Sequence, residues 1–416
     1  MIVQPGAPFP IKFEDSATIS PFGRLAVSQT QSAYSSQQQY GDDPTLWETL
    51  NSGTGAITFL PNESTVQMST GGTTSGASCI RQTKIYHRYI PSHGSSIYMT
   101  FVADSGATIT NNVRRIGYFD SNNGIFFEIN GGVLNVVERS YTSGTVSENR
   151  VPQSSWNVDK LDGTGPSGLI LDITKAQILV IDLQWLGVGR VRIGFDINGV
   201  FYPCHYFENA NALTTVYMTT ANLPCRLENT NTGVASGTAT LRHICTAVNI
   251  GGGAALDYGH QYSYNNGIAG TSIPANSRIP IISVRASTTG PNGVRNTGQI
   301  QIGQWDISAS GTNPIMWELV LNGTLTGAAF TNYSSGISIA DVDKTATAIT
   351  GGVVLDSGYL SASNQNRNMV SNVSNIKQLI LVYSSLLNNQ DQITLVCSAG
   401  TGGSAAFCNI QWLELW

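Results

Sequence analysis

Between residues 97 and 250 the chain is a succession of short strand-like segments separated by turns. Many of them alternate apolar and polar residues, or are rich in Val, Ile, Phe and Tyr, which is the pattern of half-buried β-strands. The segments are 97–102, 115–119, 125–129, 133–139, 178–185, 190–197, 200–206, 215–218 and 239–250. This spacing predicts an all-β domain.

The clearest hairpin in this region joins 191–197 to 200–206 through Asn198 and Gly199. An Asn-Gly pair can occupy the two positive-φ positions of a type I′ turn, which matches the twist of paired strands. The sequence therefore predicts a tight antiparallel hairpin here, and similar corners at 123–124 and 130–131.

A break follows at 251–276, where glycines, asparagines and Pro274 indicate a linker or an exposed loop. Strand-like segments then resume at 278–285, 299–307, 315–321, 352–355, 378–383, 392–396 and 405–415. We predict two β-sandwich domains, both jelly-roll-like, at 81–250 and 277–416.

Residues 1–80 are rich in Ser, Thr, Gln and Gly, and predict an extended N-terminal arm followed by the first irregular strands. Pro5, Pro8 and Pro10 keep the start extended, because proline fixes its own φ and restricts the preceding residue. Ordering such a segment costs roughly 1–2 kcal/mol per residue, which few core residues can offset. We expect the arm to dock on a partner.

Charged residues make up only 11% of the chain, against about 25% in an average soluble protein. The net charge of −5 and the lack of a concentrated Lys/Arg face argue against a nucleic-acid partner. The longest apolar runs, such as 177–186 with Asp182 inside it, are too short for a bilayer-spanning helix, so we expect no membrane partner. We see no secretory signal at the N-terminus.

No histidine lies in an HExxH or HxH pattern, so no metal centre is assigned from the five that exist: His87, His93, His205, His243 and His260. His205 is next to Cys204, and Glu208 follows three residues later. These residues could form a metal site or a Cys–His pair; the alternative is a strand histidine held by hydrogen bonds. The strand histidine is favoured.

Two loops combine carboxylates with Gly or Asn and could bind calcium: 159–165, with Asp159 and Asp162, and 120–124, with Asp120. Neither matches the full calcium-loop pattern, and Asp, Asn and Gly are also the residues of tight turns. We favour turns, expect no cofactor and leave a metal open.

Six cysteines occur without CxxC spacing, so buried free thiols are expected: Cys79, Cys204, Cys225, Cys245, Cys397 and Cys408. Cys397 and Cys408 flank a glycine-rich turn, which makes a cross-strand disulfide conceivable. We favour reduced thiols.

No nucleophile elbow or phosphate-binding loop is present. Glu128 and Glu138 lie on neighbouring predicted strands and could face each other as the acid pair of a glycosidase. Polar positions on an exposed sheet face are the favoured interpretation. We assign no catalytic residue and expect a protein that is not an enzyme, with a polysaccharide-trimming enzyme as the third-ranked alternative.

The stretches 156–168 (WNVDKLDGTGPSG), 175–178 (KAQI) and 185–195 (WLGVGRVRIGF) resemble a family of virion structural proteins of tailed bacteriophages, described as structural, fibre or decoration proteins. The resemblance continues through 115–120, 124–128, 204–207 and 216–218, and covers roughly residues 20 to 390. It implies a surface component mounted on head, neck or tail, in contact with other virion proteins. It also implies a homo-oligomer, with a trimer favoured, in a virion assembled in the host cytoplasm.

A second likeness concerns shape: residues 184–202 are similar to the back-sheet strands of concanavalin-like jelly rolls. The likeness keeps open an alternative function, a receptor-binding, lectin-like fibre protein that recognises host surface glycans. Its expected site is the segment 258–264, where Tyr262 and Tyr264 could stack on sugars or simply pack at a domain junction. Trp185, Trp412 and Trp416 are expected in the core or in subunit contacts.

Overall fold

The computed structural model describes residues 30–103, 108–251, 259–311, 313–360, 369–372, 379–401 and 404–416. Within these ranges the regular secondary structure consists of antiparallel β-strands and two three-residue 3-10 segments, Gln153–Ser155 and Pro291–Gly293. The predicted all-β class is confirmed. In this part of the chain no helix has the length and apolar character needed to cross a membrane.

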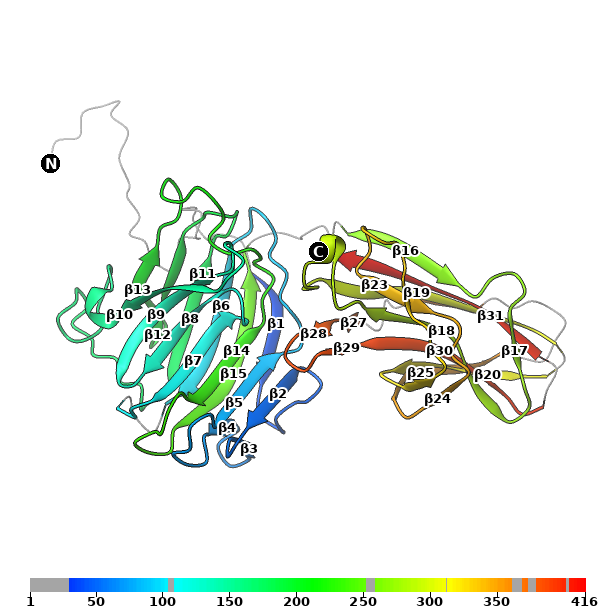
Figure 1. The fold of residues 1–416 in the computed structure, drawn as a ribbon, viewed down its shortest axis with the longest axis horizontal. Helices are drawn as coiled ribbons and strands as arrows, with labels where there is room; N and C mark the ends of the chain where they lie inside the picture. Colours follow the sequence, from blue (N-terminus) through cyan, green and yellow to red (C-terminus); the bar gives the residue numbers. More distant parts are fainter. Residues whose placement is uncertain are drawn as a thin grey trace, which may run out of the picture. The chain divides into compact units, whose positions relative to one another are not determined.

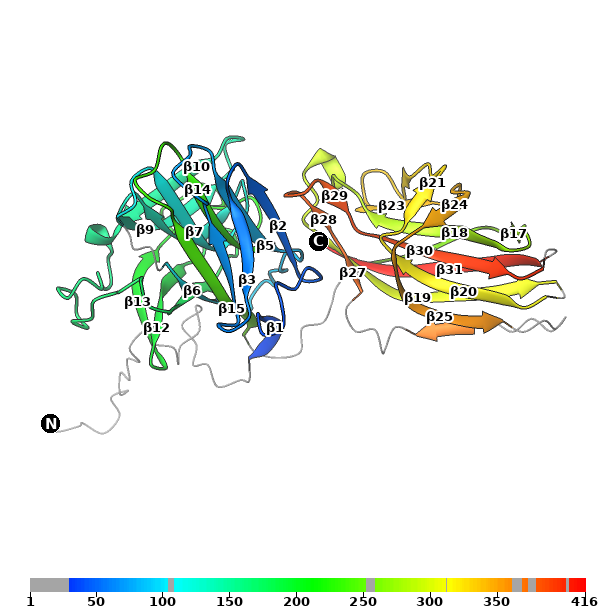
Figure 2. The ribbon, with the colours of Figure 1, turned by 90° about the horizontal axis from the view of Figure 1, so that it is seen from below.

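The chain divides into two compact units, each of them a β-sandwich (Figures 1 and 2). The first unit comprises Met1–Thr83 and Tyr89–Ala255. The second comprises Lys84–Arg88 and Leu256–Trp416, so a short segment that follows the fifth strand belongs to the second unit. Within that unit the Gln299 side-chain amide donates to the Tyr86 carbonyl at 2.7 Å.

The first unit packs an 8-stranded sheet against a 7-stranded sheet. The 8-stranded sheet has the order β13-β12-β11-β6-β15-β4-β3, with β1 also paired to β15. Its strands are β1 (Gln31–Gln37), β3 (Ala56–Leu60), β4 (Thr65–Ser69), β6 (Ser95–Val102), β11 (Gln177–Leu183), β12 (Val191–Ile197), β13 (Val200–Phe207) and β15 (Thr240–Ile250). The 7-stranded sheet has the order β10-β9-β8-β7-β14-β5-β2. Its strands are β2 (Trp47–Ser52), β5 (Ser78–Thr83), β7 (Asn112–Phe119), β8 (Gly124–Asn130), β9 (Val133–Ser140), β10 (Ser147–Pro152) and β14 (Cys225–Asn231).

Aromatic side chains join the two sheets of the first unit. Phe127 on β8 lies 5.9 Å from Phe101 on β6 and 5.3 Å from Phe195 on β12, measured between ring centroids. All three side chains are fully buried. Burying one such ring stabilises the fold by about 1.5–3 kcal/mol, so these contacts help to fix how the sheets face each other.

Residues 31–83 form five strands of the first unit, not irregular strands attached to an arm. β1 pairs along its length with β15, and Trp47 on β2 is buried and donates its indole N–H to Ser36 Oγ at 2.9 Å. The Ser- and Gln-rich composition hid these strands because only alternate residues, such as Tyr34 and Ser36, point inward. The predicted arm itself, residues 1–29, lies outside the described residues.

The predicted hairpin at 198–199 is confirmed. Asn198 and Gly199 have φ of 56° and 82°, as a type I′ turn requires, and Gly199 N–H donates to Asp196 Oδ1 at 2.9 Å. By contrast, the predicted strand at 215–218 is not a strand. Tyr217 is buried there, and its backbone N–H donates to the carbonyl of Gly187, a turn residue, at 2.9 Å.

The second unit packs two 6-stranded sheets. The first has the order β16-β31-β19-β26, with β17 also paired to β31 and β27 to β19. Its strands are β16 (His260–Asn265), β17 (Thr271–Ile273), β19 (Gln299–Ser310), β26 (Met369–Asn372), β27 (Ile380–Leu381) and β31 (Ser404–Leu415). The other has the order β22-β23-β18-β30-β20-β25. Its strands are β18 (Ser277–Ala286), β20 (Ile315–Leu321), β22 (Thr331–Asn332), β23 (Ala340–Asp343), β25 (Val353–Leu360) and β30 (Gln392–Ala399).

The segment 251–276, predicted as a linker or an exposed loop, contains two of these strands. Both β16 and β17 pair with β31 and are separated by a turn with Gly267 and Gly270 in positive φ. Along β16, Tyr262 and Tyr264 are half-buried while Ser263 and Asn265 are exposed. This alternation was concealed by the neighbouring glycines and asparagines. Residues 252–258 lie outside the described part.

Candidate functional site

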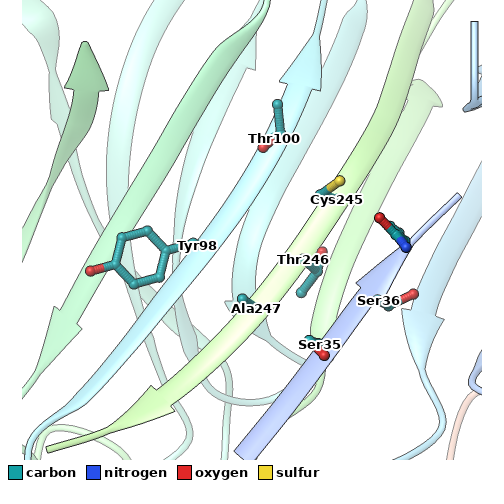
Figure 3. Close-up of a pocket in the computed structure, with 8 residues that line it drawn as sticks. Ser35, Ser36, Tyr98, Thr100, Cys245, Thr246 and Ala247 are labelled. Carbon is teal, nitrogen blue, oxygen red and sulfur yellow. The ribbon is translucent and has the colours of Figure 1, made fainter. Parts of the chain in front are cut away.

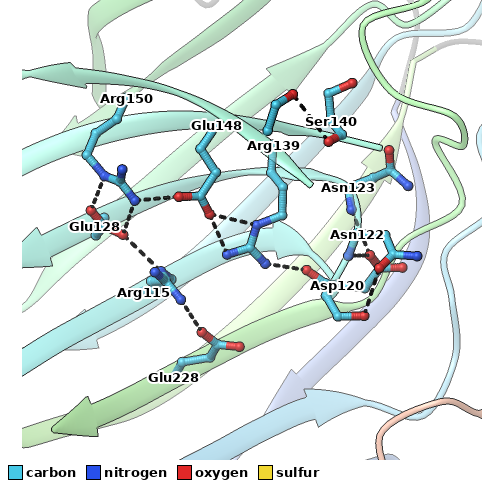
Figure 4. A network of polar contacts seen from close by, with 12 residues as sticks. Arg115, Asp120, Asn122, Asn123, Glu128, Arg139, Ser140, Glu148, Arg150 and Glu228 are labelled. Atoms are coloured by element: carbon cyan, nitrogen blue, oxygen red, sulfur yellow. Dashed lines mark hydrogen bonds and ion pairs between the residues drawn. The ribbon is translucent and has the colours of Figure 1, made fainter. Parts of the chain in front are cut away.

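A row of charged side chains crosses the outer face of the 7-stranded sheet (Figure 4). Glu128 on β8 pairs with Arg115 on β7 at 2.9 Å and with Arg150 on β10 at 2.6 Å. Arg115 also reaches Glu228 on β14, at 3.0 Å. Glu128 has no exposed surface although it points away from the core, because its partners lie over it.

Aromatic rings form the floor of this charged row. The Arg139 guanidinium lies 4.8 Å from the centroid of Phe126 and 5.5 Å from that of Phe119, and it pairs with Glu148 at 2.8 Å. Arg226 lies 5.6 Å from the Phe119 ring. Guanidinium groups stack favourably on aromatic faces, so the row is held from below by rings and from the side by carboxylates.

Two acids of the row, Glu228 and Glu148, are held in their charged form. Burial alone would raise the pKa of Glu228, but Arg226 and Arg115 outweigh it and hold that pKa below its ordinary value. In Glu148, too, burial is outweighed by Arg139, and the pKa is lowered. A general acid for glycoside cleavage needs the opposite, a carboxyl that keeps its proton near neutral pH. The row is suited to stiffening the sheet.

Glu128 and Glu138 do not face each other, so the acid pair considered from the sequence is not formed. Glu138 on β9 stands opposite Ile125 and points into the sandwich, while Glu128 stands opposite Asn135 on the outer face. Asn209 donates its side-chain amide to Glu138 at 3.0 Å. Burial raises the pKa of Glu138 to about 7.

The loop 159–165 uses its carboxylates to hold backbone amides. Asp159 accepts from the Leu161 N–H at 2.9 Å and from the Ser167 N–H at 2.8 Å. Asp162 accepts from the hydroxyl and the N–H of Thr164, which lowers the pKa of Asp162. These are the contacts of tight turns.

The loop 120–124 has the same construction. Asp120 Oδ1 accepts from the N–H groups of Asn122 and Asn123, at 2.7 and 2.8 Å (Figure 4). The Asn123 side chain in turn accepts from the Thr219 N–H at 3.0 Å. In the described ranges as a whole, no group of three or more His, Cys, Asp or Glu side chains is placed to hold a metal ion.

His205 and Cys204 form no pair. His205 Nδ1 accepts from the Asn157 N–H at 3.3 Å, and burial lowers the pKa of His205 to about 4. Cys204 lies fully buried in the core and contacts Ile193 O at 3.3 Å through its sulfur. Glu208 is exposed. The hydrogen-bonded strand histidine is what the structure contains.

All six cysteines carry free thiols. Cys397 on β30 and Cys408 on β31 belong to different sheets, so their side chains meet across the core and not across one hairpin ladder. A hydrogen bond with Cys397, together with burial, raises the pKa of the Cys408 thiol. Burial raises the pKa of Cys79 to about 11. Protonated thiols of this kind are poor nucleophiles.

A hollow of about 460 Å³ lies on the outer face of the 8-stranded sheet of the first unit. Figure 3 shows Tyr98 on β6, with the small side chains of β15 and β1 beside it. The lining residues are Ser35, Ser36, Gln37, Tyr98, Thr100, Cys245, Thr246 and Ala247. The hollow therefore offers hydroxyls, one amide and one phenol ring.

The chemistry of this hollow is limited to hydrogen bonding and ring contact. Burial raises the pKa of Tyr98, with Asp182 and Asp196 adding to it, and burial raises the pKa of Cys245. Both groups therefore keep their protons at neutral pH. Asp182 is engaged by Arg192 in an ion pair. Such a lining suits a small neutral ligand and provides neither a general base nor an activated nucleophile.

The aromatic residues expected to form a glycan site pack within the second unit. Tyr262 lies 5.1 Å from Tyr333 and 6.0 Å from the buried Trp412, and Tyr264 lies 6.4 Å from Tyr333. Tyr258 lies outside the described residues. The rings at 262 and 264 thus close one edge of the sandwich.

The three tryptophans singled out from the sequence have different environments. Trp412 is 1% exposed and donates its indole N–H to the buried Glu414 at 3.0 Å. Trp185 is half-buried beside Tyr89, at 5.8 Å between ring centroids. Trp416 is 47% exposed and stacks on His260 at 5.1 Å. Only Trp416 keeps much of its ring open for contacts with a neighbour.

Sequence reasoning missed the residues of β1 that line the hollow on the 8-stranded sheet and the residues of β14 that extend the charged row on the 7-stranded sheet. Ser35 and Gln37 line the hollow, and Arg226 and Glu228 extend the charged row. The available signal was alternation, since Cys225, Arg226, Leu227 and Glu228 already alternate between apolar and charged.

No family model matches the sequence, and no curated protein matches it. A carbohydrate esterase from the Shiga toxin-encoding bacteriophage phi24B is similar in structure, at 12% identity and a TM-score of 0.32, covering 54% of this chain and 100% of the other. The CBM2 module of the evolved Dit protein of Lactobacillus casei phage J-1 is similar at 7% identity and a TM-score of 0.34, covering 55% and 99%.

A putative β-glucanase from Mycobacterium abscessus is similar in structure at 11% identity and a TM-score of 0.35, covering 52% of this chain and 100% of the other. Each likeness therefore involves about half of this chain.

Proposed function

We propose that this chain is a structural component of a tailed-phage particle, mounted on head, neck or tail, and that it is not an enzyme. The observation that carries the proposal is the structural role of the stretches that resemble virion structural proteins. Each of these stretches supplies contacts that build the sandwich.

Three features illustrate this role. Arg115 and Glu128 pair across β7 and β8, at 2.9 Å. Trp156 is 3% exposed and belongs to the core of the first unit. Asp159 holds the turn that follows it. The residues that carry the resemblance thus stabilise the fold. This suits a protein that is a stable part of a larger assembly.

The ionisable groups support the same proposal. The acids of the charged row are neutralised by arginines, and the thiols and the Tyr98 phenol keep their protons. A low-charge, well-satisfied surface suits contacts with neighbouring subunits, and we include in the proposal a homo-oligomer, with a trimer favoured. The edge strand β25, with Val353 60% exposed and Tyr359 75% exposed, offers apolar surface for such neighbours.

Immunogold electron microscopy of intact particles tests the location. Antibodies raised against the purified chain are expected to decorate one region of the particle, at the head, the neck or the tail. Antibodies that label only lysate proteins, while a capsid antibody labels the same particles, would overturn the proposal.

Incubation of the purified chain with host capsular polysaccharide tests whether it is an enzyme. It is expected to release no reducing ends. Release that a Glu138→Gln or a Glu128→Gln variant loses would show an enzyme.

Recognition of host surface glycans is a second candidate function. It is favoured by a separate feature of the second unit, an outer sheet face on which amides, hydroxyls and the carboxylate of Asp306 surround Phe407.

A further inference from the structure

The first sheet of the second unit carries a polar outer face on three neighbouring strands. Core residues such as Trp305, Ile307 and Ile410 point inward, and the residues between them point outward. The register places Asn265, Asn409 and Asp306 side by side across β16, β31 and β19. The outward residues are Ser263, Asn265, Gln304, Asp306, Ser308, Phe407, Asn409 and Gln411.

A hollow of about 460 Å³ opens on this face. Its lining is formed by Asn265, Asn266, Gly267, Gln304, Asp306, Ile307, Ser308, Phe407, Cys408 and Asn409. This volume falls in the range of small-molecule sites, roughly 300–1,000 Å³.

The polar side chains on the floor of the hollow are oriented by one another. Asp306 accepts from the side-chain amide of Gln304 at 3.2 Å and from that of Asn409 at 3.3 Å. Asn409 Oδ1 accepts from the Ser263 hydroxyl at 2.7 Å. An ionised carboxylate has about four acceptor positions and each amide NH₂ has two donors, so Asp306 and Asn409 retain hydrogen-bonding capacity for a ligand.

The wall of the hollow is fixed by Asn266. Its side-chain NH₂ donates to Ala406 O at 2.9 Å, and its side-chain oxygen Oδ1 accepts from the Cys408 N–H at 2.9 Å. The Asn266 side chain thus takes the place of a neighbouring strand's backbone at this point of β31. The turn that follows passes close to Phe407, where a Cβ on Gly270 would come within 2.8 Å of the ring. Asn266 and Gly270 thereby hold the turn beside the Phe407 ring, which remains half-exposed.

The lining restricts the class of ligand. It contains no Lys, Arg or His, so it has no cationic side chain to pair with an anion, and the carboxylate of Asp306 disfavours one. Asp306 is its one carboxylate, too few for a calcium or magnesium ion, which needs six or more oxygen ligands. Phe407 is its one aromatic residue among amides and hydroxyls, which does not suit a wholly apolar ligand. A neutral, polyhydroxylated ring with one apolar face satisfies all of these conditions.

We infer that this hollow binds neutral carbohydrate. Ring hydroxyls donate to Asp306 and exchange hydrogen bonds with Asn409 and Asn265, while the C–H face of the sugar ring lies on Phe407. The inference gives the second candidate function a defined site and rests on that candidate. It is independent of the location of the chain on a particle.

Saturation-transfer NMR and titration on the full purified chain test this site. The probes are glucose, galactose, N-acetylglucosamine and rhamnose, with glucuronate as the anionic match of glucose. The variants are Asp306→Asn, which removes the charged acceptor but keeps the shape, and Phe407→Ala. The matched control is Asp356→Asn, on β25 of the other sheet.

Wild-type chain is expected to bind at least one neutral sugar and to bind glucuronate more weakly than glucose. Asp306→Asn and Phe407→Ala are each expected to weaken binding about tenfold, with Asp356→Asn within about twofold of wild type. A hydrogen bond to a charged group, for Asp306, and apolar area buried against the ring, for Phe407, each contribute roughly that much to an affinity. Circular dichroism melting confirms that each variant is folded.

Absence of binding to all four neutral sugars, or binding that survives both variants, overturns the inference. Either result leaves the particle-labelling experiment unaffected, so the two proposals fail separately.

Discussion

Glu128 and Glu138 lie on adjacent strands of one sheet and point to its opposite faces. β8 and β9 pair so that Glu128 stands opposite Asn135, and Glu138 lies three residues further along β9. Side chains alternate with a period of two, so an odd offset moves a residue to the other face. One acid therefore belongs to the charged outer row, and the other is enclosed with Asn209.

Replacing Glu138 by Gln should remove a pH dependence of stability. The pKa of Glu138 is raised from 4.5 to about 7 in the folded chain, so the folded state binds more protons between these values. The free energy of unfolding contributed by Glu138 therefore falls as the pH rises from about 4.5 to 7, by about 3 kcal/mol, and is constant outside that window. Gln keeps an oxygen to accept from Asn209.

Urea unfolding of wild type and Glu138→Gln at about pH 4 and about pH 8 measures this effect. The variant should gain stability relative to wild type at the higher pH. Taking the difference between the two proteins cancels the contribution of the buried histidines. An equal difference at both pH values would show that Glu138 is ionised in the folded chain well below neutral pH.

Glu128→Gln should destabilise the first unit by about 2 kcal/mol. The substitution removes the charge shared by Arg115 and Arg150, but each arginine retains a second acid, Glu228 and Glu148 respectively, which limits the loss. The exposed Glu208 provides a control, and Glu208→Gln should stay within about 0.5 kcal/mol of wild type. Equal denaturant midpoints for all three proteins would show that the charged row does not stabilise the sheet.

Chelation should leave the melting temperature unchanged, whereas Asp159→Ala should lower stability by about 2–3 kcal/mol. The Asp159 carboxylate holds the N–H groups of Leu161 and Ser167, and both lose their acceptor in the variant. Thermal melts with and without EDTA, on wild type and variant, separate the two cases. A fall in the wild-type melting temperature that calcium reverses would identify a metal site in this loop.

Deleting residues 1–25 should leave a folded chain that no longer joins particles. The described residues begin at 30, and β1 with its full pairing to β15 is retained in the truncated chain. A cooperative melt by circular dichroism and incorporation during infection are measured together. Loss of the melt would place the arm in the core, and normal incorporation would place attachment elsewhere on the chain.

Alternation predicts those strands whose inward residues are all apolar. Ile97, Met99 and Phe101 show the pattern clearly, and β6 is found where it was expected. In β14 the alternation covers only 225–228 and is then interrupted by Asn229, which points inward. Its side chain donates to Met68 O and Ala239 O, both at 3.0 Å, and so satisfies the interior without breaking the strand.

The candidate acid pair could not be resolved from the sequence for a related reason. On β8 the consecutive residues Ile125, Phe126 and Phe127 are all fully buried, because both faces of this sheet carry apolar side chains. Such a run does not reveal which residues point inward. The face of Glu128 is set by the register with β7 and β9, which is a property of the folded sheet.

Quantitative mass spectrometry of gradient-purified particles tests the central claim most directly. We expect peptides of this chain in a fixed copy number per particle, relative to the major capsid protein, that survives high-salt washing and repeated banding. A chain that is abundant in the lysate but lost from the particles on banding would contradict a structural role in the virion.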